Sequence, residues 1–420
     1  MRMAKWTRAP LGNVADLCLG KMLDQDKNRG EPLPYLANVN VRWGEFVLDN
    51  LRTMRFEPHE RERYGLKFGD IVMCEGGEPG RCAIWKEQTP GMMIQKALHR
   101  IRPHEVLDFQ FLFYNLLNLG NTKRFDQYFT GATIKHLPGE KLAKVEVDIP
   151  PLPVQRRIAG ILSAYDDLIE NSRRRIKILE TMARALYREW FVQFRFPGHE
   201  NHPRVASPLG ETPEGWEAAT FSQAANFENG DRGKNYPNGS DFVGDGIPFI
   251  NAGHLVDGSV NLFDMNYIDE TKFGQLRSGK IRNGDILFCL RGSLGRTART
   301  AILSVGAIAS SLVIIRPTKR TNETFLFYTL TDEIGKQMVA ELNNGAAQPN
   351  VSVGSIQNYP LLLPPKNLLL DLERSIDPIW RQMELLRSRL SNFRKQRDLL
   401  LPRLLSGQIE VDKLPDPVAA

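Results

Sequence analysis

The chain has 420 residues, of which 42% are hydrophobic and 25% charged, values that exclude a disordered or fibrous protein. This length suits two to four domains of ordinary size. Lysine and arginine exceed aspartate and glutamate by six, a mild basic excess that permits an anionic partner without requiring one. The four cysteines show no CxxC spacing, which argues against structural zinc and a disulfide framework and favours a reduced, cytoplasmic protein.

The sequence predicts no membrane segment. The first six residues lack the apolar run of a signal peptide. The longest uncharged stretch, residues 301–315, is shorter than the roughly 18–20 residues that a membrane-spanning helix needs. We therefore expect buried strands in this stretch.

The sequence repeats itself once over most of its length. Pro34-Tyr35-Leu36 matches Pro248-Phe249-Ile250 at an offset of 214 (248 minus 34). Gly69-Asp70-Ile71 matches Gly284-Asp285-Ile286 at an offset of 215 (284 minus 69). Further pairs follow in the same order: Gly80 with Gly295, Ile101–Pro103 with Ile315–Pro317, Phe111–Tyr114 with Phe325–Tyr328, Gly131 with Gly345, and Pro150 with Pro364. This period is far longer than that of a solenoid repeat and predicts two tandem copies of a whole domain.

Each copy is predicted to contain an α+β domain followed by a helical region. Short β-branched and aromatic runs between glycines and prolines indicate strands in residues 1–149 and 201–363, with a helix around 107–119 and again around 324–339. The helical regions cover residues 150–200 and 364–410, and residues 411–420 form a tail.

Start signals place the two long helices at about 164–192 and 378–405. Ser163 and Asp166 form a capping-box pattern, and Asp377-Pro378 supplies an N-cap followed by proline. Pro402 is expected to kink or end the second helix near Leu401.

Both helical regions carry apolar residues at alternating steps of four and three. The predicted seam contains Tyr165, Ile169, Ile176, Leu179, Leu186 and Trp190 in the first region, and Ile379, Met383, Leu386, Leu390, Phe393, Leu400 and Leu404 in the second. Ala183 also belongs to the first row, and the polar exceptions are Ser172 in the first row and Arg397 in the second. A sustained 3.5-residue period is typical of a coiled coil. We predict that the two helices pair with each other; the alternative is that each stripe packs on its own domain.

The predicted rod has a length that suits DNA. A helix over residues 164–190 would span roughly 40 Å, or about 12 base pairs at 3.4 Å each. Binding domains at opposite ends of such a rod would meet DNA sites about one helical turn apart.

The sequence contains no recognisable catalytic constellation. It has no GxxxxGK[ST] phosphate loop, no GxSxG, no HExxH and no Asp/Asn-Pro-Pro-aromatic tetrad. His199 and His202 lie between prolines in a linker, and Cys74 and Cys289 fall in strand-like runs typical of buried small side chains. No catalytic, cofactor-binding or metal-binding residue is predicted, so a recognition or scaffold component is favoured over an enzyme.

Several segments together resemble the DNA-specificity (S) subunit of type I restriction–modification systems. They are Ile149–Gln155 leading into Arg156-Arg157-Ile158, the helix through Leu168–Asn171, and the loops Gly131–Leu137 and Gly345–Asn350. The resemblance covers essentially the whole chain in two tandem halves. Its second half departs from the pattern, because Pro365-Lys366-Asn367-Leu368 lacks the Gln-Arg-Arg of the first.

The resemblance implies two target-recognition domains, residues 1–149 and 201–363, each reading one half of a split double-stranded DNA sequence. It implies that the helical regions form an antiparallel coiled coil that fixes the spacer. Two adenine methyltransferase (M) subunits would dock on these regions, and restriction (R) subunits are optional partners. S-adenosylmethionine, ATP and Mg would be bound by those partners and not by this chain.

Candidate DNA contacts come from equivalent loops of the two copies. Arg81 and Arg296 follow glycine-rich turns, and the guanidinium fork suits guanine or phosphate. Lys135 and His136 occupy the first of the two loops above, and Gln348 and Asn350 the second. Arg232, Lys234 and Arg291 are electrostatic candidates, as are Arg42, Arg52 and Arg55.

Other interpretations remain open at this stage. Each arginine could be a turn residue paired with a local carboxylate, and the loop residues could bond their own backbone. The whole chain could be a coiled-coil scaffold with duplicated protein-binding domains and no DNA recognition, or an enzyme with an unrecognised site.

Overall fold

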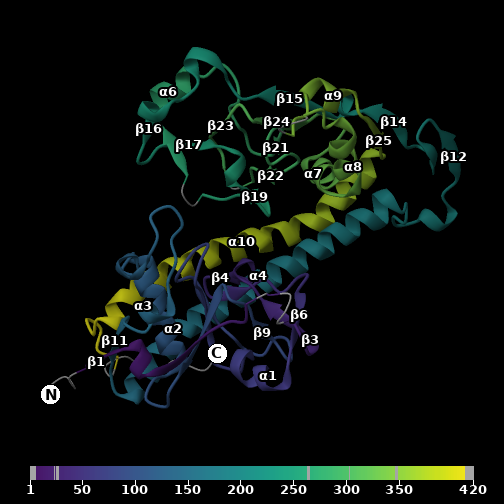
Figure 1. Cartoon of the computed structure of the whole chain (residues 1–420). Helices are drawn as coiled ribbons and strands as arrows, with labels where there is room; N and C mark the ends of the chain where they lie inside the picture. Colours follow the sequence, from purple (N-terminus) through teal and green to yellow (C-terminus); the bar gives the residue numbers. More distant parts are fainter. Residues whose placement is uncertain are drawn as a thin grey trace. The chain divides into compact units, whose positions relative to one another are not determined.

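The computed structural model describes residues 6–22, 24, 28–262, 265–301, 303–345 and 349–411. The chain forms two compact units, the first of Met1–Ser172 with Arg389–Ala420 and the second of Arg173–Ser388. Two long helices, α4 (Leu152–Tyr187) and α10 (Lys366–Leu405), contribute residues to both units (Figure 1). The predicted boundaries at residues 149, 200 and 363, which place the helical regions outside the domains, stay predictions.

The main sheets of the two units repeat one strand order. In the first unit the order is β2-β10-β7-β8, and in the second β15-β24-β21-β22 continues into β19 and β18. The four shared strands are antiparallel neighbours in both units. Their bounds are β2 Ala15–Leu19, β10 Leu98–Pro103, β7 Ile71–Cys74, β8 Cys82–Ile84, β15 Ala225–Asn229, β24 Leu312–Pro317, β21 Ile286–Cys289, β22 Thr297–Arg299, β19 Gly258–Val260 and β18 Leu255–Val256.

A smaller sheet and a two-stranded ribbon also recur. The smaller sheets run β6-β3-β9 and β16-β20-β17-β23, and the ribbons are β1-β11 and β14-β25. The repeated sequence therefore gives repeated topology. The bounds are β1 Thr7–Pro10, β3 Glu31–Leu36, β6 Arg52–Phe56, β9 Met93–Ile94, β11 Glu146–Ile149, β14 Glu217–Thr220, β16 Phe242–Val243, β17 Ile247–Ile250, β20 Asn266–Ile268, β23 Ala307–Ile308 and β25 Pro360–Leu363; a hairpin, β4 Val41–Arg42 with β5 Glu45–Phe46, belongs to the first unit, and a second ribbon, β12 Arg204–Ser207 with β13 Gly210–Pro213, belongs to the second.

Helices cover the sheets of each unit. The predicted helix around 107–119 is α2 (Phe109–Asn121), whereas the patch around 324–339 is divided at Asp332 into α7 and α8. Asp332 is the N-cap of α8 and accepts a hydrogen bond from the Glu333 N–H at 2.9 Å. The remaining bounds are α1 Pro58–Tyr64, α3 Gly139–Leu142, α5 Phe221–Ala224, α6 Glu270–Gln275, α7 Glu323–Thr331, α8 Glu333–Leu342 and α9 Val353–Asn358.

Both long helices begin earlier than predicted, at Leu152 and Lys366 instead of about 164 and 378. The hydroxyl of Ser163 donates to the Gly160 carbonyl instead of capping a helix start. Proline is tolerated in the first turn of a helix because the N–H groups of that turn have no intrahelical partner. The prolines before α4 are therefore compatible with a start at Leu152, which the capping pattern at Ser163 did not indicate. Pro378 lies inside α10 and does not mark its start.

α10 continues past Pro402 and ends at Leu405, which is the predicted end of the second long helix. Leu401, Leu404 and Leu405 are buried in the core of the first unit and hold the last turn despite the missing proline N–H. α4 is followed by a π-helical turn, Arg188–Val192.

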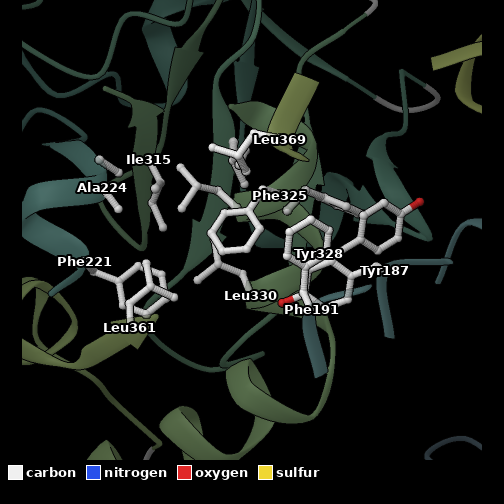
Figure 2. Close-up of a cluster of buried hydrophobic side chains, with 14 of the residues drawn as sticks. Tyr187, Phe191, Phe221, Ala224, Ile315, Phe325, Tyr328, Leu330, Leu361 and Leu369 are labelled. Atoms are coloured by element: carbon white, nitrogen blue, oxygen red, sulfur yellow. The ribbon is translucent and has the colours of Figure 1, made fainter. Parts of the chain in front are cut away.

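Each domain packs on segments of both long helices. In the second unit, side chains from α4, α5, β24, α7, β25 and α10 form one core, part of which Figure 2 shows: Tyr187, Phe191, Phe221, Ala224, Ile315, Phe325, Tyr328, Leu330, Leu361 and Leu369. In the first unit, the start of α4 and the end of α10 pack together with α2. In each unit the start of one long helix therefore packs with the end of the other, so α4 and α10 are antiparallel. The predicted α+β fold with antiparallel long helices is confirmed.

The predicted seam residues face inward along both helices. Ile169, Trp190, Met383, Leu386 and Leu404 are buried. The half-buried seam residues are Tyr165, Ile176, Leu179, Leu186, Ile379, Leu390, Phe393 and Leu400. Among the described residues, no helix is both long and apolar enough to span a membrane.

Candidate nucleic-acid interface

Each unit contains a surface groove at an equivalent place in the repeat. The first groove has a volume of about 510 Å³ and is lined by Asn38, Val39, Arg42, Trp43, Glu78 and Arg81. The second groove, of about 350 Å³, is lined by Leu255, Val256, Asp257, Gly258, Arg296 and Thr297. Arg42 corresponds to Val256 (256 minus 42 is 214) and Arg81 to Arg296 (296 minus 81 is 215). Both grooves therefore lie between the segment after β3 or β17 and the glycine-rich turn.

The glycine-rich turn has the same geometry in both units. Gly80 and Gly295 have φ angles of +89° and +79°, a left-handed conformation that favours glycine. Their N–H groups donate to the carbonyls of Cys74 and Cys289, both at 3.0 Å. The turn thereby presents an arginine at the start of β8 or β22 in each groove.

Arg81 is largely engaged by its own domain. Its Nη1 donates to Glu78 Oε2 at 2.6 Å, and its Nη2 donates to the Asn38 carbonyl at 3.0 Å. Its side chain is only 12% exposed. The local-carboxylate interpretation thus describes this arginine, although it still forms part of the groove wall.

Arg296 differs because Ser293 replaces the carboxylate of Glu78 (293 minus 78 is 215). The Arg296 side chain is exposed. Within the part of the chain that the structure describes, no ion pair engages it. The second groove consequently offers an exposed guanidinium that lacks a carboxylate partner among the described residues.

Lys135 and His136 lie beside the first glycine-rich turn. His136 pairs with Gly76 in an isolated bridge, and its Nδ1 lies 3.5 Å from Glu75 Oε2. The Lys135 Nζ lies 3.5 Å from Asp126 Oδ2 and 5.7 Å from the centre of the Phe129 ring. Its side chain is 55% exposed, so the charge faces solvent next to the turn that bears Arg81.

Asn350 takes the equivalent place in the second unit. It forms an isolated bridge with Arg291, and its N–H donates to Asn343 Oδ1 at 3.1 Å. The Nη2 of Arg291 donates to the Ser310 carbonyl at 3.2 Å. Gln348 lies outside the described residues.

Arg232 and Lys234 belong to another segment, between β15 and β16, and do not line the second groove. Both side chains are exposed. Asp231 beside them accepts hydrogen bonds from the Arg277 and Arg232 N–H groups, which lower the pKa of its carboxyl despite the opposing effect of desolvation.

The groove lining contains one prominent residue that the sequence did not indicate. Trp43 is 38% exposed, and its indole packs so closely on Gly120 that a Cβ at Gly120 would approach it to 2.3 Å. The equivalent of Trp43 in the second copy is Asp257 (257 minus 43 is 214). Because the two residues differ, the repeat did not indicate Trp43 as a groove residue. An aromatic face beside arginines is suited to nucleic-acid bases or sugars.

Comparisons with known proteins agree with this architecture. Residues 3–181 match the family model described as the type I restriction modification DNA specificity domain. The chain is 26% identical over 352 residues to the type I restriction enzyme MjaIX specificity subunit of Methanocaldococcus jannaschii, covering 82% of this chain and 79% of that protein. It is 23% identical to the MjaVIII specificity subunit of the same organism, covering 91% and 87%.

A solved structure shares the fold. The crystal structure of a type I restriction-modification system S subunit from M. genitalium superimposes with a TM-score of 0.59 at 16% identity, covering 96% of this chain and 97% of that one. The first domain thus belongs to the type I DNA specificity domains. Over most of its length the chain is similar to specificity subunits of type I restriction–modification systems, in agreement with the resemblance seen in the sequence.

Proposed function

We propose that this subunit recognises a bipartite double-stranded DNA sequence, with one domain reading each half and the paired helices setting the spacer. The observation that supports this most directly is the recurrence of one arginine-bearing groove in each of two topologically equivalent domains. Relatives over more than four-fifths of the chain are named specificity subunits.

The chemistry would belong to partner subunits. Two M subunits would dock on the helical regions and transfer a methyl group from S-adenosylmethionine to adenine, and R subunits, where present, would use ATP and Mg. The sequence supports this division, because the chain lacks the phosphate-loop and methyltransferase motifs that those reactions use. The chain itself would act without an active site of its own.

The two grooves would not contribute equally through their arginines. Arg296 is exposed and has no ion-pair partner in the part of the chain that the structure describes, whereas Arg81 is held by Glu78 and Asn38. We expect Arg296 to contact a base edge or phosphate directly and Arg81 chiefly to shape its groove. A direct base contact contributes about 1–3 kcal/mol.

The experiment is methylome sequencing of cells that express this chain with its M partner. The wild-type complex should methylate a split motif. Arg296→Ala should relax or abolish one half of that motif, and should weaken DNA binding by the purified complex roughly 5–150-fold. Lys336→Ala is the control, since Lys336 is an exposed lysine of α8 in the same unit.

A complex that methylates DNA without a split motif would refute the proposal. Absence of DNA binding at every salt concentration with all partners present would favour the scaffold alternative, because phosphate-driven binding strengthens as salt falls.

A further inference from the structure

One layer of the helix pair has opposite chemistry in the two units. Asp166 of α4 and Trp380 of α10 are equivalent in the repeat (380 minus 166 is 214), and so are Ala183 and Arg397 (397 minus 183 is 214). In the first unit, Arg397 Nη1 donates to Asp166 Oδ1 at 2.6 Å. Position 166 of α4 thus faces position 397 of α10, and by the repeat position 183 faces position 380.

The first-unit layer is charged and internally satisfied. The Tyr114 hydroxyl donates to Asp166 Oδ2 at 2.6 Å, so the domain and both helices meet at this carboxylate. The Asp166 side chain is 31% exposed and the Arg397 side chain 19%. A carboxylate in this position needs partners, because partial burial of an unpaired charge is costly.

The second-unit layer is aromatic. Trp380 is 5% exposed, and its Nε1 donates to the hydroxyl of Tyr328, the equivalent of Tyr114, at 3.0 Å. Its ring lies 5.1 Å from the ring of Phe327 and 4.4 Å from the Arg299 guanidinium. Ala183 is fully buried in the same core, and by the repeat it takes the position opposite Trp380.

We propose that these two unlike layers make each half of the chain select the other half and reject a second copy of itself. The first half, residues 1–208, contains α4, and the second half, residues 209–420, contains α10. If two first halves paired in the observed antiparallel register, Asp166 would face the methyl group of Ala183 and lose Arg397. If two second halves paired, Trp380 would face the long side chain of Arg397 in place of alanine.

This inference goes beyond the proposed function, since it concerns which helices pair and involves no DNA. Hydrophobic seams alone would not make the distinction, because both helices present apolar residues at equivalent positions. A polar position within an otherwise apolar seam is a known means of fixing register and partner. Here the Asp166–Arg397 layer is polar, and its equivalent in the second unit is aromatic.

The test uses the complete chain cut at one place. A protease site is inserted between Pro208 and Leu209, in the exposed turn between β12 and β13. Two preparations that carry different N-terminal tags are cut, mixed and left to exchange in mild denaturant, which is then removed. Capture of one tag should recover second halves and almost none of the other tag.

Variants at Asp166 should allow two first halves to pair, which is the opposite of the result expected for the wild type. Asp166→Ala removes the carboxylate that opposes pairing of two first halves, so capture of the other tag should rise roughly tenfold. Asp166→Asn removes only the charge at nearly constant volume, and serves if the alanine variant melts before the assay temperature. Asp167→Ala, a change at an adjacent exposed aspartate, is the matched control and should behave as wild type.

Two outcomes would overturn the proposal. One is wild-type first halves that capture each other as readily as they capture second halves. The other is no rise in capture with either Asp166 variant. Neither outcome bears on whether the intact chain reads DNA.

Discussion

The aspartate of the repeated Gly-Asp-Ile motif proves to be structural. Asp70 accepts two hydrogen bonds from Arg102, both at 2.7 Å, and Asp285 accepts two from Arg316 at 2.7 and 2.8 Å. Each carboxylate also accepts a backbone N–H three residues earlier in the chain and is only 1% exposed. The motif thus ties the turn before β7 or β21 to the neighbouring strand β10 or β24, which gives its repetition a structural reason.

Removing Arg102 should destabilise the first domain strongly. Arg102→Ala leaves the buried Asp70 carboxylate without its cation, and breaking a buried pair in this way costs about 3–5 kcal/mol. Urea unfolding measures the loss. Arg8→Ala is the control, because the Arg8–Asp148 pair is exposed and its loss should cost less than about 1 kcal/mol. Equal losses for the two variants would contradict the structural role of Asp70.

The contact between Arg188 and Asp332 should make the free energy of unfolding depend on pH in the acidic range. Burial alone would raise the pKa of the Asp332 carboxyl, but hydrogen bonds from Arg188 and the Glu333 N–H outweigh it and lower the pKa. A lowered folded-state pKa means that the stabilisation is present above the unfolded value of about 3.9 and is lost as pH falls through the folded value.

The Tm of the wild type should therefore exceed that of Arg188→Ala near neutral pH, and the difference should shrink below about pH 4. Melting curves between pH 7 and pH 2.5 measure it. Arg195→Ala, which breaks the exposed Arg195–Glu189 pair, should show a small difference at every pH. A constant gap for Arg188→Ala would show that Arg188 acts by packing and not through the carboxylate.

The candidate site was predictable only in outline. The repeat located Arg81 and Arg296 and the loops beside their turns, because turn chemistry is local in sequence. It could not show that Arg81 is held by the Asn38 carbonyl, 43 residues away, or that Trp43 lines the groove. Such contacts depend on tertiary packing, which the spacing of residues does not encode.

At the scale of elements, periodicity predicted the helix faces but not where the two long helices begin. A 3.5-residue pattern reports which side of a helix is buried, and the predicted seam lies on the buried side of both helices. The strands β11 and β25 finish just before Pro150-Pro151 and Pro365, and these prolines mark the starts of the two helices. Sequence signals inside the helix, at Ser163 and Asp377-Pro378, resembled caps and gave the wrong start.

Trp380 is expected to be the main attachment of α10 to the second domain. Trp380→Ala removes the contact with Phe327, the hydrogen bond to Tyr328 and the ring beneath Arg299, and truncation of such a side chain costs about 3–5 kcal/mol. Urea unfolding of the full chain measures it. Leu399→Ala, at a 62% exposed position of the same helix, should change stability by no more than about 0.5 kcal/mol. A loss below about 1 kcal/mol for Trp380→Ala would show that this attachment is weak.

At the scale of the whole molecule, the duplicated chain contains two domains of similar topology and two long helices that each contribute residues to both units. Ser172 is the last residue of α4 in the first unit, and Ser388 is the last residue of α10 in the second. A seven-residue insertion after each serine keeps the seam in phase, because seven residues make one full period of the pattern. Each unit would keep its own segments of α4 and α10.

Under the proposed function, this double insertion should lengthen the spacer of the recognised sequence and leave both halves unchanged. Seven residues add about 10.5 Å at 1.5 Å per residue, or about three base pairs at 3.4 Å each. Methylome sequencing of cells that express the variant with its M partner measures the spacer directly. The same heptad inserted after Pro208, in the exposed turn between β12 and β13, should leave the spacer unaltered. A double-insertion variant that methylates the original motif would show that the helices do not set the spacing, and that the two grooves are held apart by some other part of the chain.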